Sequence, residues 1–279
     1  MRSRAVMRFR RHRLAMFGLA AIASLVIAVV VGPSLIPFDE LHIDIRHRFA
    51  PPLIDGHLFG TDQLGRDLLV RILSGGRISL AIGFAAMVIS MLFGTTIGLA
   101  AGYYGGVVNA MLMRFVDAVL CFPPVFLLLV LAAFITPSIT MITLVIAATS
   151  WMEVARVVQS QIKALRERDF TLAAEMLGAS GSYIMFNELL RNAIGPIIVA
   201  ATLTVARAIL AEAYVSFLGY GIQPPLASWG NMLNNAQQYL ASAPWLAIFP
   251  GLAITLAVAS FNFVGDGLRD ALDARMDVG

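Results

Sequence analysis

The stretch "ISLAIGFAAMVISMLFGTTIGLAA", residues 78–101, carries no charged side chain over 24 residues. A helix that crosses the hydrocarbon core of a bilayer needs about 20 consecutive, mainly apolar residues. Further windows of similar length carry at most two charged side chains each, at residues 14–36, 115–135, 138–158, 196–218 and 245–265. The sequence therefore predicts an all-α, polytopic membrane protein with six transmembrane helices.

The overall composition agrees with a membrane location. Of the 279 residues only 13% are charged and 59% are hydrophobic, and the mean hydropathy is +0.81. Soluble domains carry about 25% charged residues. A cleaved signal peptide has an apolar core of only about 7–15 residues, whereas the first window, residues 14–36, is 23 residues long. We therefore expect an uncleaved first span.

The distribution of Lys and Arg predicts the orientation. With the N-terminus in the cytoplasm, the inner segments hold 13 of these residues and the outer segments hold five. An excess of basic residues marks the cytoplasmic loops of membrane proteins. We expect both termini to be cytoplasmic, and the net charge of +3 to reflect an inner surface that meets anionic lipid, with no nucleic-acid partner.

These spans divide the chain into five predicted regions. They are a basic cytoplasmic tail (1–13), the first transmembrane helix (14–36), a periplasmic loop with an interfacial helix (37–77), a core of five spans (78–268) and a cytoplasmic tail (269–279). In the periplasmic loop, Thr61 or Asp62 is suited to cap an interfacial helix over Gln63–Leu73. In the last outer loop, Trp229 is expected at interface depth.

The inner connection between the fourth and fifth spans, residues 159–195, is too polar to cross a bilayer. Its pattern predicts two short helices, over Leu165–Leu177 and Tyr183–Asn192, with Gly178 able to cap the first and Ser182 the second. A projecting helix-turn-helix of this kind is a candidate docking surface.

The residues of this connection also carry a family resemblance. Ala173-Ala174-x-x-x-Gly178-Ala179-Ser180 resembles the cytoplasmic EAA loop of ABC importer permeases, which inserts into the ATP-binding subunit. The stretches 59–80, 101–124, 208–233 and 261–275 resemble, in matching order, the C-type permease of the dipeptide/oligopeptide (peptide/nickel) importer family. Two positions depart from the family pattern, because Leu172 replaces the Glu that opens the motif and Arg191 replaces a Pro.

The resemblance implies a type I ABC importer permease fold and a set of partners. These are a second, B-type permease subunit that completes a heterodimer, two ATP-binding subunits and a periplasmic substrate-binding protein. It implies that ATP and Mg²⁺ are bound by the ATPase subunits, with no cofactor on this chain. It also implies ATPase coupling through Ala173, Ala174, Glu175, Gly178, Ala179 and Ser180. Dipeptides, longer peptides, glutathione-like molecules and nickel chelates all remain open as substrates.

Three charged residues within the spans are candidates for a translocation path: Asp117, Arg207 and Glu212. Charge inside a bilayer is costly, so such groups face a partner or a wet cavity. For Glu212 and Asp117, a bond that braces neighbouring helices is the favoured alternative, and for Arg207 a path and a subunit contact are equal alternatives. Arg207 and Glu212 lie on different faces of one helix and should not pair.

Other chemistry finds little support. Lys163 is the only lysine and does not belong to a phosphate-binding Walker motif. His12, His42, His47 and His57 show no metal-ligand spacing, and we expect surface histidines, no metal site and no catalytic residues. The single cysteine, Cys121, is expected to be a buried, inert thiol. A secondary transporter or channel outside the ABC class is the alternative function, and a membrane-embedded enzyme is the third.

Overall fold

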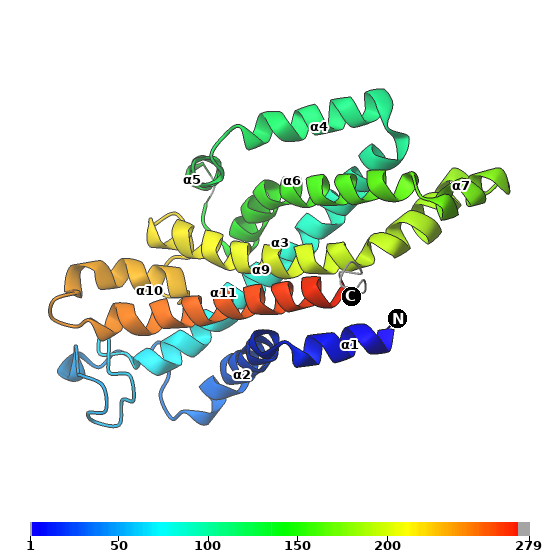
Figure 1. Ribbon diagram of the computed structural model, residues 1–279. Helices are drawn as coiled ribbons and strands as arrows, with labels where there is room; N and C mark the ends of the chain where they lie inside the picture. Colours follow the sequence, from blue (N-terminus) through cyan, green and yellow to red (C-terminus); the bar gives the residue numbers. More distant parts are fainter. Residues whose placement is uncertain (1, 135, 273–279) are drawn as a thin grey trace.

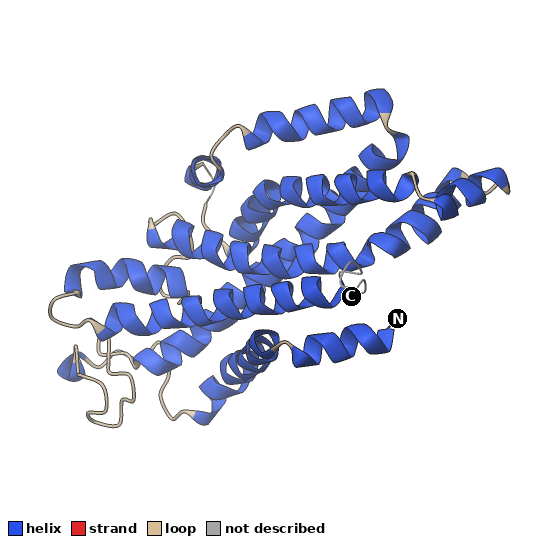
Figure 2. Ribbon diagram, viewed as in Figure 1, coloured by secondary structure: helices blue, strands red, loops and turns tan. Residues whose placement is uncertain are grey.

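The computed structural model describes residues 2–134 and 136–272, and every regular element within them is a helix (Figures 1 and 2). In chain order these are α1 (Arg2–Arg11), α2 (Arg13–Leu35), η1 (Ile45–His47), α3 (Leu68–Tyr104), α4 (Gly106–Leu120), α5 (Pro124–Ala133), α6 (Ile139–Arg166), α7 (Asp169–Met176), α8 (Gly181–Tyr183), η2 (Ile184–Leu190), α9 (Arg191–Phe217), α10 (Trp229–Ala236), η3 (Gln237–Tyr239) and α11 (Trp245–Leu272). Five helical runs are long and apolar enough to cross a membrane, namely α2, α3, α6, α8 through α9, and α11.

The expected third span is broken. Residues 115–135 do not form one helix, because α4 and α5 meet at an angle of 79°. Pro123 and Pro124 explain the break, since proline cannot donate to the preceding helical turn and restricts the residue before it. The described residues therefore contain six spans only when this bent pair is counted as one. Residue 135 lies outside them.

The separate interfacial helix expected over Gln63–Leu73 is also absent. Asp67, not Thr61 or Asp62, caps the helix that follows by accepting a hydrogen bond from the backbone N–H of Val70 (2.9 Å). Asp62 instead accepts from the N–H groups of Leu64 (2.8 Å) and Arg66 (3.0 Å), which closes a tight turn. The span of residues 78–101 thus belongs to one helix that starts ten residues earlier, at Leu68.

The inner connection is shorter and more helical than expected. The fourth span continues to Arg166, so the first short helix is confined to α7. The second is continuous through the π-helical segment η2 into α9, and Arg191, at the position of the family's proline, has helical dihedrals (φ −62°, ψ −37°). Ser180, rather than Ser182, caps this second helix.

Close helix packing holds the core together. Gly94 and Gly98 of α3 face α6 so tightly that an added Cβ would lie 2.6 Å from the Trp151 carbonyl oxygen and 2.5 Å from the Ala155 carbonyl oxygen, respectively. On the other side of α3, buried side chains of α9, α10 and α11 form one hydrophobic cluster around Trp229 and Phe261. Trp229 is only 1% exposed, so it packs inside the bundle, and its position at interface depth stays a prediction.

The elements separate into two ends (Figure 1). Helices α1 and α7 and the last turns of α11 lie toward one end, and α10 and the loop of residues 36–67 lie toward the other. Aromatic contacts tie this loop to the helices beside it, with ring centroids 4.7 Å apart for Phe49 and Tyr239 and 4.1 Å apart for Phe59 and Phe249. The loop is therefore a packed cap on the bundle.

Candidate coupling turn and transport groove

The turn that follows α7 has the hydrogen bonds of a Schellman motif. The N–H of Ala179 donates to the carbonyl of Ala174 (3.1 Å), and the N–H of Gly178 donates to the carbonyl of Glu175 (3.0 Å). Gly178 has φ +78°, the left-handed conformation that this motif requires at its glycine. The prediction that Gly178 ends the first short helix is confirmed.

The six predicted coupling residues divide into a surface and its support. Ala173, Glu175, Gly178 and Ser180 are exposed, whereas Ala174 and Ala179 pack against the hydrophobic cluster beneath the turn. Met176 and Leu177, which the sequence reasoning did not select, are 89% and 87% exposed. Met176 and Leu177 are large apolar residues next to Gly178 in an otherwise polar connection, and this pattern in the sequence would have identified them. We call the exposed residues 172, 173, 175–178 and 180 the coupling turn.

The coupling turn is attached to both long helices that flank it. The hydroxyl of the fully buried Thr171 donates to the carbonyl of Leu165 at the end of α6 (2.9 Å). On the other side, Ile184 and Leu189 of η2 are buried in one cluster with Val158 and Ile162 of α6. These contacts connect α7 to α6 and, through η2, to α9.

A groove of about 220 Å³ lies between α5, α6 and α9. It is lined by Val125, Leu128, Leu129, Thr149, Ser150, Glu153, Thr204, Arg207, Leu210, Ala211, Tyr214 and Val215. The α9 residues among them recur every three or four positions, so they form one stripe along that helix. Of the three predicted path residues, only Arg207 belongs to the groove.

Two ion pairs cross between helices on this side of the molecule. Arg207 of α9 pairs with Glu153 of α6, and their side chains are 59% and 47% exposed. Arg156, one turn further along α6, pairs with Asp117 of α4, with Nε 3.2 Å from the carboxylate oxygen Oδ1. Asp117 thus bonds to a neighbouring helix, as its favoured interpretation predicts, but its side chain is 51% exposed and not buried, and it lies outside the groove lining.

Glu212 is enclosed within the fold. It is fully buried and accepts hydrogen bonds from the hydroxyls of Ser79 and Ser216, both at 2.7 Å. The same two hydroxyls accept from the backbone N–H groups of Trp229 (3.2 Å) and Ile222 (3.1 Å). Glu212 therefore joins α3, α9 and the loop before α10, which favours the bracing interpretation. Glu212 does not line the groove, so its part in a translocation path stays a prediction.

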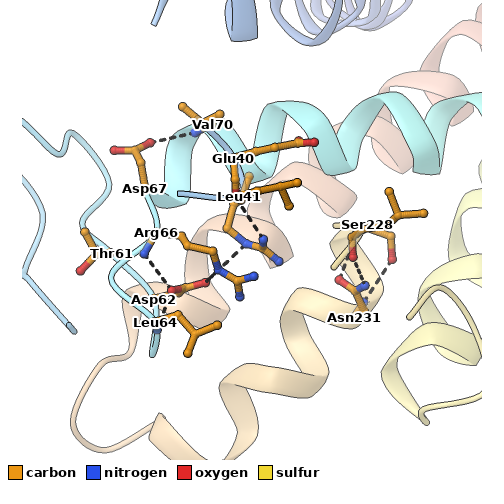
Figure 3. Close-up of polar contacts among 12 residues, drawn as sticks. Glu40, Leu41, Thr61, Asp62, Leu64, Arg66, Asp67, Val70, Ser228 and Asn231 are labelled. Atoms are coloured by element: carbon orange, nitrogen blue, oxygen red, sulfur yellow. Dashed lines mark hydrogen bonds and ion pairs between the residues drawn. The ribbon is translucent and has the colours of Figure 1, made fainter. Parts of the chain in front are cut away.

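The cap at the opposite end contains a buried charge network (Figure 3). Asp62 pairs with Arg66 (Nε to Oδ2, 2.7 Å) and with Arg71 (3.5 Å), and all three side chains are at most 7% exposed. Asp67 accepts from Val70 and also lies 2.7 Å from Nδ1 of His57. Because buried charges are tolerated only when paired and hydrogen-bonded, this network fixes the start of α3.

The structure contradicts two predictions about reactive side chains. His57 is buried against Asp67 and stacks on Phe38, so it is not a surface histidine. Cys121 is exposed at the end of α4, because the helix stops where the prolines begin, so the expected buried thiol is wrong. Within the described residues no group of three or more His, Cys, Asp or Glu is placed to hold a metal ion.

Family models identify the class of protein. A model described as "Binding-protein-dependent transport system inner membrane component" matches residues 94–278, and one described as the N-terminal TM domain of oligopeptide transport permease C matches residues 1–52. The chain belongs to the family of binding-protein-dependent inner-membrane transport components. It is a multi-pass permease subunit of an ABC importer, as its sequence resemblance implied.

Individual relatives of this permease match along nearly the whole chain. The dipeptide transport system permease protein DppC of Alkalihalophilus pseudofirmus is 40% identical over 98% of this chain and 89% of its own length. The oligopeptide transport system permease protein OppC of Bacillus subtilis is 38% identical over the same shares. A putative peptide permease protein of Brucella suis is 42% identical over 99% of this chain and 92% of its own.

A solved structure shares the fold of this permease. A chain of the MetNI methionine ABC transporter, in an inward-facing conformation, superposes with a TM-score of 0.60 at 19% identity. The match covers 72% of this chain and 96% of that one. The expected type I importer fold is therefore confirmed.

Proposed function

We propose that this subunit is one half of a heterodimeric, ATP-driven permease that carries peptides from the periplasm to the cytoplasm. One of two ATP-binding subunits would dock on the coupling turn, a B-type permease would complete the heterodimer, and a periplasmic binding protein would deliver the peptide to the cap. ATP and Mg²⁺ would be bound by the ATPase subunits alone. The observation that carries the proposal is the near full-length similarity to relatives named as dipeptide and oligopeptide permeases.

The arrangement of charge supports the orientation in this proposal. Arg8, Arg10 and Arg11 lie in the last turn of α1, at the same end of the molecule as the coupling turn (Figure 1). Basic residues concentrate on the cytoplasmic side of membrane proteins. The ATPase-facing surface and the basic tail therefore share one side, and the cap lies on the other.

The attachments of α7 supply the coupling mechanism. When the ATPase subunits close, they displace α7, and its links to α6 and η2 carry the movement to the two helices that hold Glu153 and Arg207. The groove between α5, α6 and α9 then changes shape, which alternates its opening between the two sides of the membrane. The chain transmits force and lines a path, and ATP hydrolysis takes place on its partners.

Uptake by a reconstituted complex tests the function. This permease would be purified with the partner permease, ATPase subunits and binding protein encoded beside its gene, and placed in proteoliposomes. We expect accumulation of labelled di- and tripeptides that requires both ATP and the binding protein. Labelled nickel chelate and glutathione are the comparison substrates. Uptake of either of those without uptake of any peptide contradicts the proposed substrate.

Labelling of a single cysteine tests the orientation. In a Cys121→Ala background, Ser3→Cys should react with a membrane-impermeant thiol reagent only after the cytoplasmic face is opened. Labelling of intact cells from outside contradicts a cytoplasmic N-terminus. Phe38→Cys in the same background, in the loop after the first span, is the matched position expected to react from outside.

A further inference from the structure

The Glu153–Arg207 pair differs from a bracing contact. Glu153 and Arg207 are 47% and 59% exposed within a run of helices that cross the membrane. Charged side chains at such positions face a protein partner or a water-filled cavity rather than lipid, because hydrocarbon cannot solvate them. Both line the groove. The pair therefore presents one negative and one positive group to whatever enters it.

The rest of the groove suits a ligand with variable side chains. Its walls are mainly aliphatic, from Val125, Leu128 and Leu129 of α5 and Leu210 and Val215 of α9. The hydroxyls of Thr149, Ser150 and Thr204 already donate to carbonyls of their own helices, so they do not compete for specific groups. The two charges are the directional recognition elements, beside the hydroxyl of Tyr214.

A zwitterionic peptide matches this arrangement by charge. Its ammonium group would bind the carboxylate of Glu153, and its carboxylate would bind the guanidinium of Arg207, a pairing that can be bidentate. In the empty groove the two side chains neutralise each other, and with a peptide each pairs with one terminus. In both states each charge has an opposite charge beside it, so the exchange leaves no unpaired charge within the spans.

We propose that Glu153 and Arg207 form a transient peptide-binding site, in which Glu153 holds the N-terminal ammonium and Arg207 holds the C-terminal carboxylate. The inference rests on the proposed function, since it assumes that peptides enter the groove. It adds a residue, Glu153, and a polarity of binding to that function.

Equilibrium binding to the permease complex tests the site. The complex with its partner permease and ATPase subunits would be placed in nanodiscs without binding protein, so that the selectivity of that protein does not contribute. The probes are radiolabelled dialanine, N-acetyl-dialanine and dialanine amide. We expect the unmodified complex to prefer the free dipeptide over both capped forms by about tenfold, the effect of one charged hydrogen bond of roughly 1.4 kcal/mol.

Two variants should each remove one half of this preference. Glu153→Gln should bind dialanine and its N-acetyl form equally while still discriminating against the amide, and Arg207→Gln should show the reverse. Arg156→Gln is the matched control, because it also breaks an exposed interhelical ion pair but lies outside the groove lining. Recovery of the partner subunits by gel filtration would show that each variant assembles, and the Glu153→Arg, Arg207→Glu double variant provides a charge-preserving form should a single variant fail to assemble.

The outcomes separate this inference from the function on which it rests. Equal binding of free and capped dialanine by the unmodified complex, or retention of both preferences in the two variants, overturns the site while leaving peptide uptake intact. Absence of peptide uptake in proteoliposomes instead overturns the proposed function.

Discussion

The two faces of α9 place charged groups in opposite surroundings. Glu212 is completely buried and bonded to two hydroxyls of the same chain, whereas Arg207, five residues earlier, is 59% exposed and pairs across a groove. Five residues turn a helix by about 140° beyond one full turn, so the two side chains point away from each other. One face of α9 therefore closes the fold, and the other is available to a transported molecule.

The difference shows that a charge within a span does not by itself indicate function. The hydroxyls around Glu212 also accept from backbone groups of the loop before α10, so this carboxylate organises the closed face. The contact of Glu153 with Arg207 involves only two exposed side chains. Glu212 holds several further groups in place, as a bracing residue does, whereas Glu153 and Arg207 hold only each other.

Removal of the two carboxylates should give the largest contrast in stability. Glu212→Ala leaves a cavity and two buried hydroxyls without their acceptor, at a cost of about 3 kcal/mol. Glu153→Ala removes a half-exposed ion pair and should cost less than about 1 kcal/mol. Thermal inactivation of the detergent-purified complex compares them. Equal losses would show that the two faces of α9 do not differ in the way described.

A second contrast concerns the packing of the closed face. Gly230 of α10 lies against α9 so closely that an added Cβ would be 2.7 Å from both the Cα and the carbonyl oxygen of Ala213. Gly230→Ala should therefore force the helices apart, at a cost of about 1–3 kcal/mol. Gly251→Ala is the control, since no atom lies within 4 Å of the added group, and it should leave the thermal midpoint unchanged or raise it. A stable Gly230→Ala complex would contradict tight packing here.

A third variant changes the coupling turn, which precedes α9 in the sequence. Gly178 has φ +78° and open space around its Cα, so a larger residue meets backbone strain rather than a clash. Gly178→Val should strain the turn by about 1 kcal/mol or more and uncouple uptake from ATP hydrolysis, with the spans still inserted. Gly178→Asn, which tolerates this conformation, should retain coupling. Normal uptake and normal peptide-stimulated hydrolysis in the valine variant would remove the turn from the mechanism.

The smallest effect on stability is expected in the cap. The buried His57 pairs with Asp67, whereas the more exposed His47 pairs with Asp44. The hydrogen bond between His47 and Asp44 raises the pKa of His47 above 6.5 and lowers the pKa of Asp44 below 3.8. The His47 contribution is complete below pH 6.5 and is lost as the pH rises through the raised pKa. The Asp44 contribution is complete above pH 3.8 and is lost as the pH falls through the lowered pKa.

The pair therefore stabilises the cap most between these two pH values. The difference in thermal midpoint between the unmodified complex and His47→Gln should be greatest near pH 5 and should shrink at alkaline pH. A difference that grows with pH would contradict the assigned pair. Arg46→Gln, beside it, serves as the control, because the substitution keeps the backbone N–H that donates from residue 46 to Asp44.

The sequence predicted the helical class, the positions of five spans and the glycine turn, because these depend on local composition and conformation. It did not predict the break after Cys121, which depends on how Pro123 and Pro124 affect the neighbouring turns. It also did not predict the unbroken helix from η2 into α9, where η2 packs against distant residues of α6. Arg207 was selected by charge alone. Its partner Glu153, and the enclosure of Glu212 by two serines, arise from contacts between distant segments that no local pattern contains.

The most direct test of the two-faced helix compares Ala208→Cys with Ala211→Cys in the Cys121→Ala background. Ala208 is fully buried in the core, whereas Ala211 lines the groove three residues further along α9. In nanodiscs, which expose both sides of the complex, a membrane-impermeant thiol reagent should label the cysteine at position 211 and leave that at position 208 unmodified. Dialanine should slow the reaction at 211. Labelling at 208, or equal protection of both positions, would contradict the assignment of the groove face to the transported peptide.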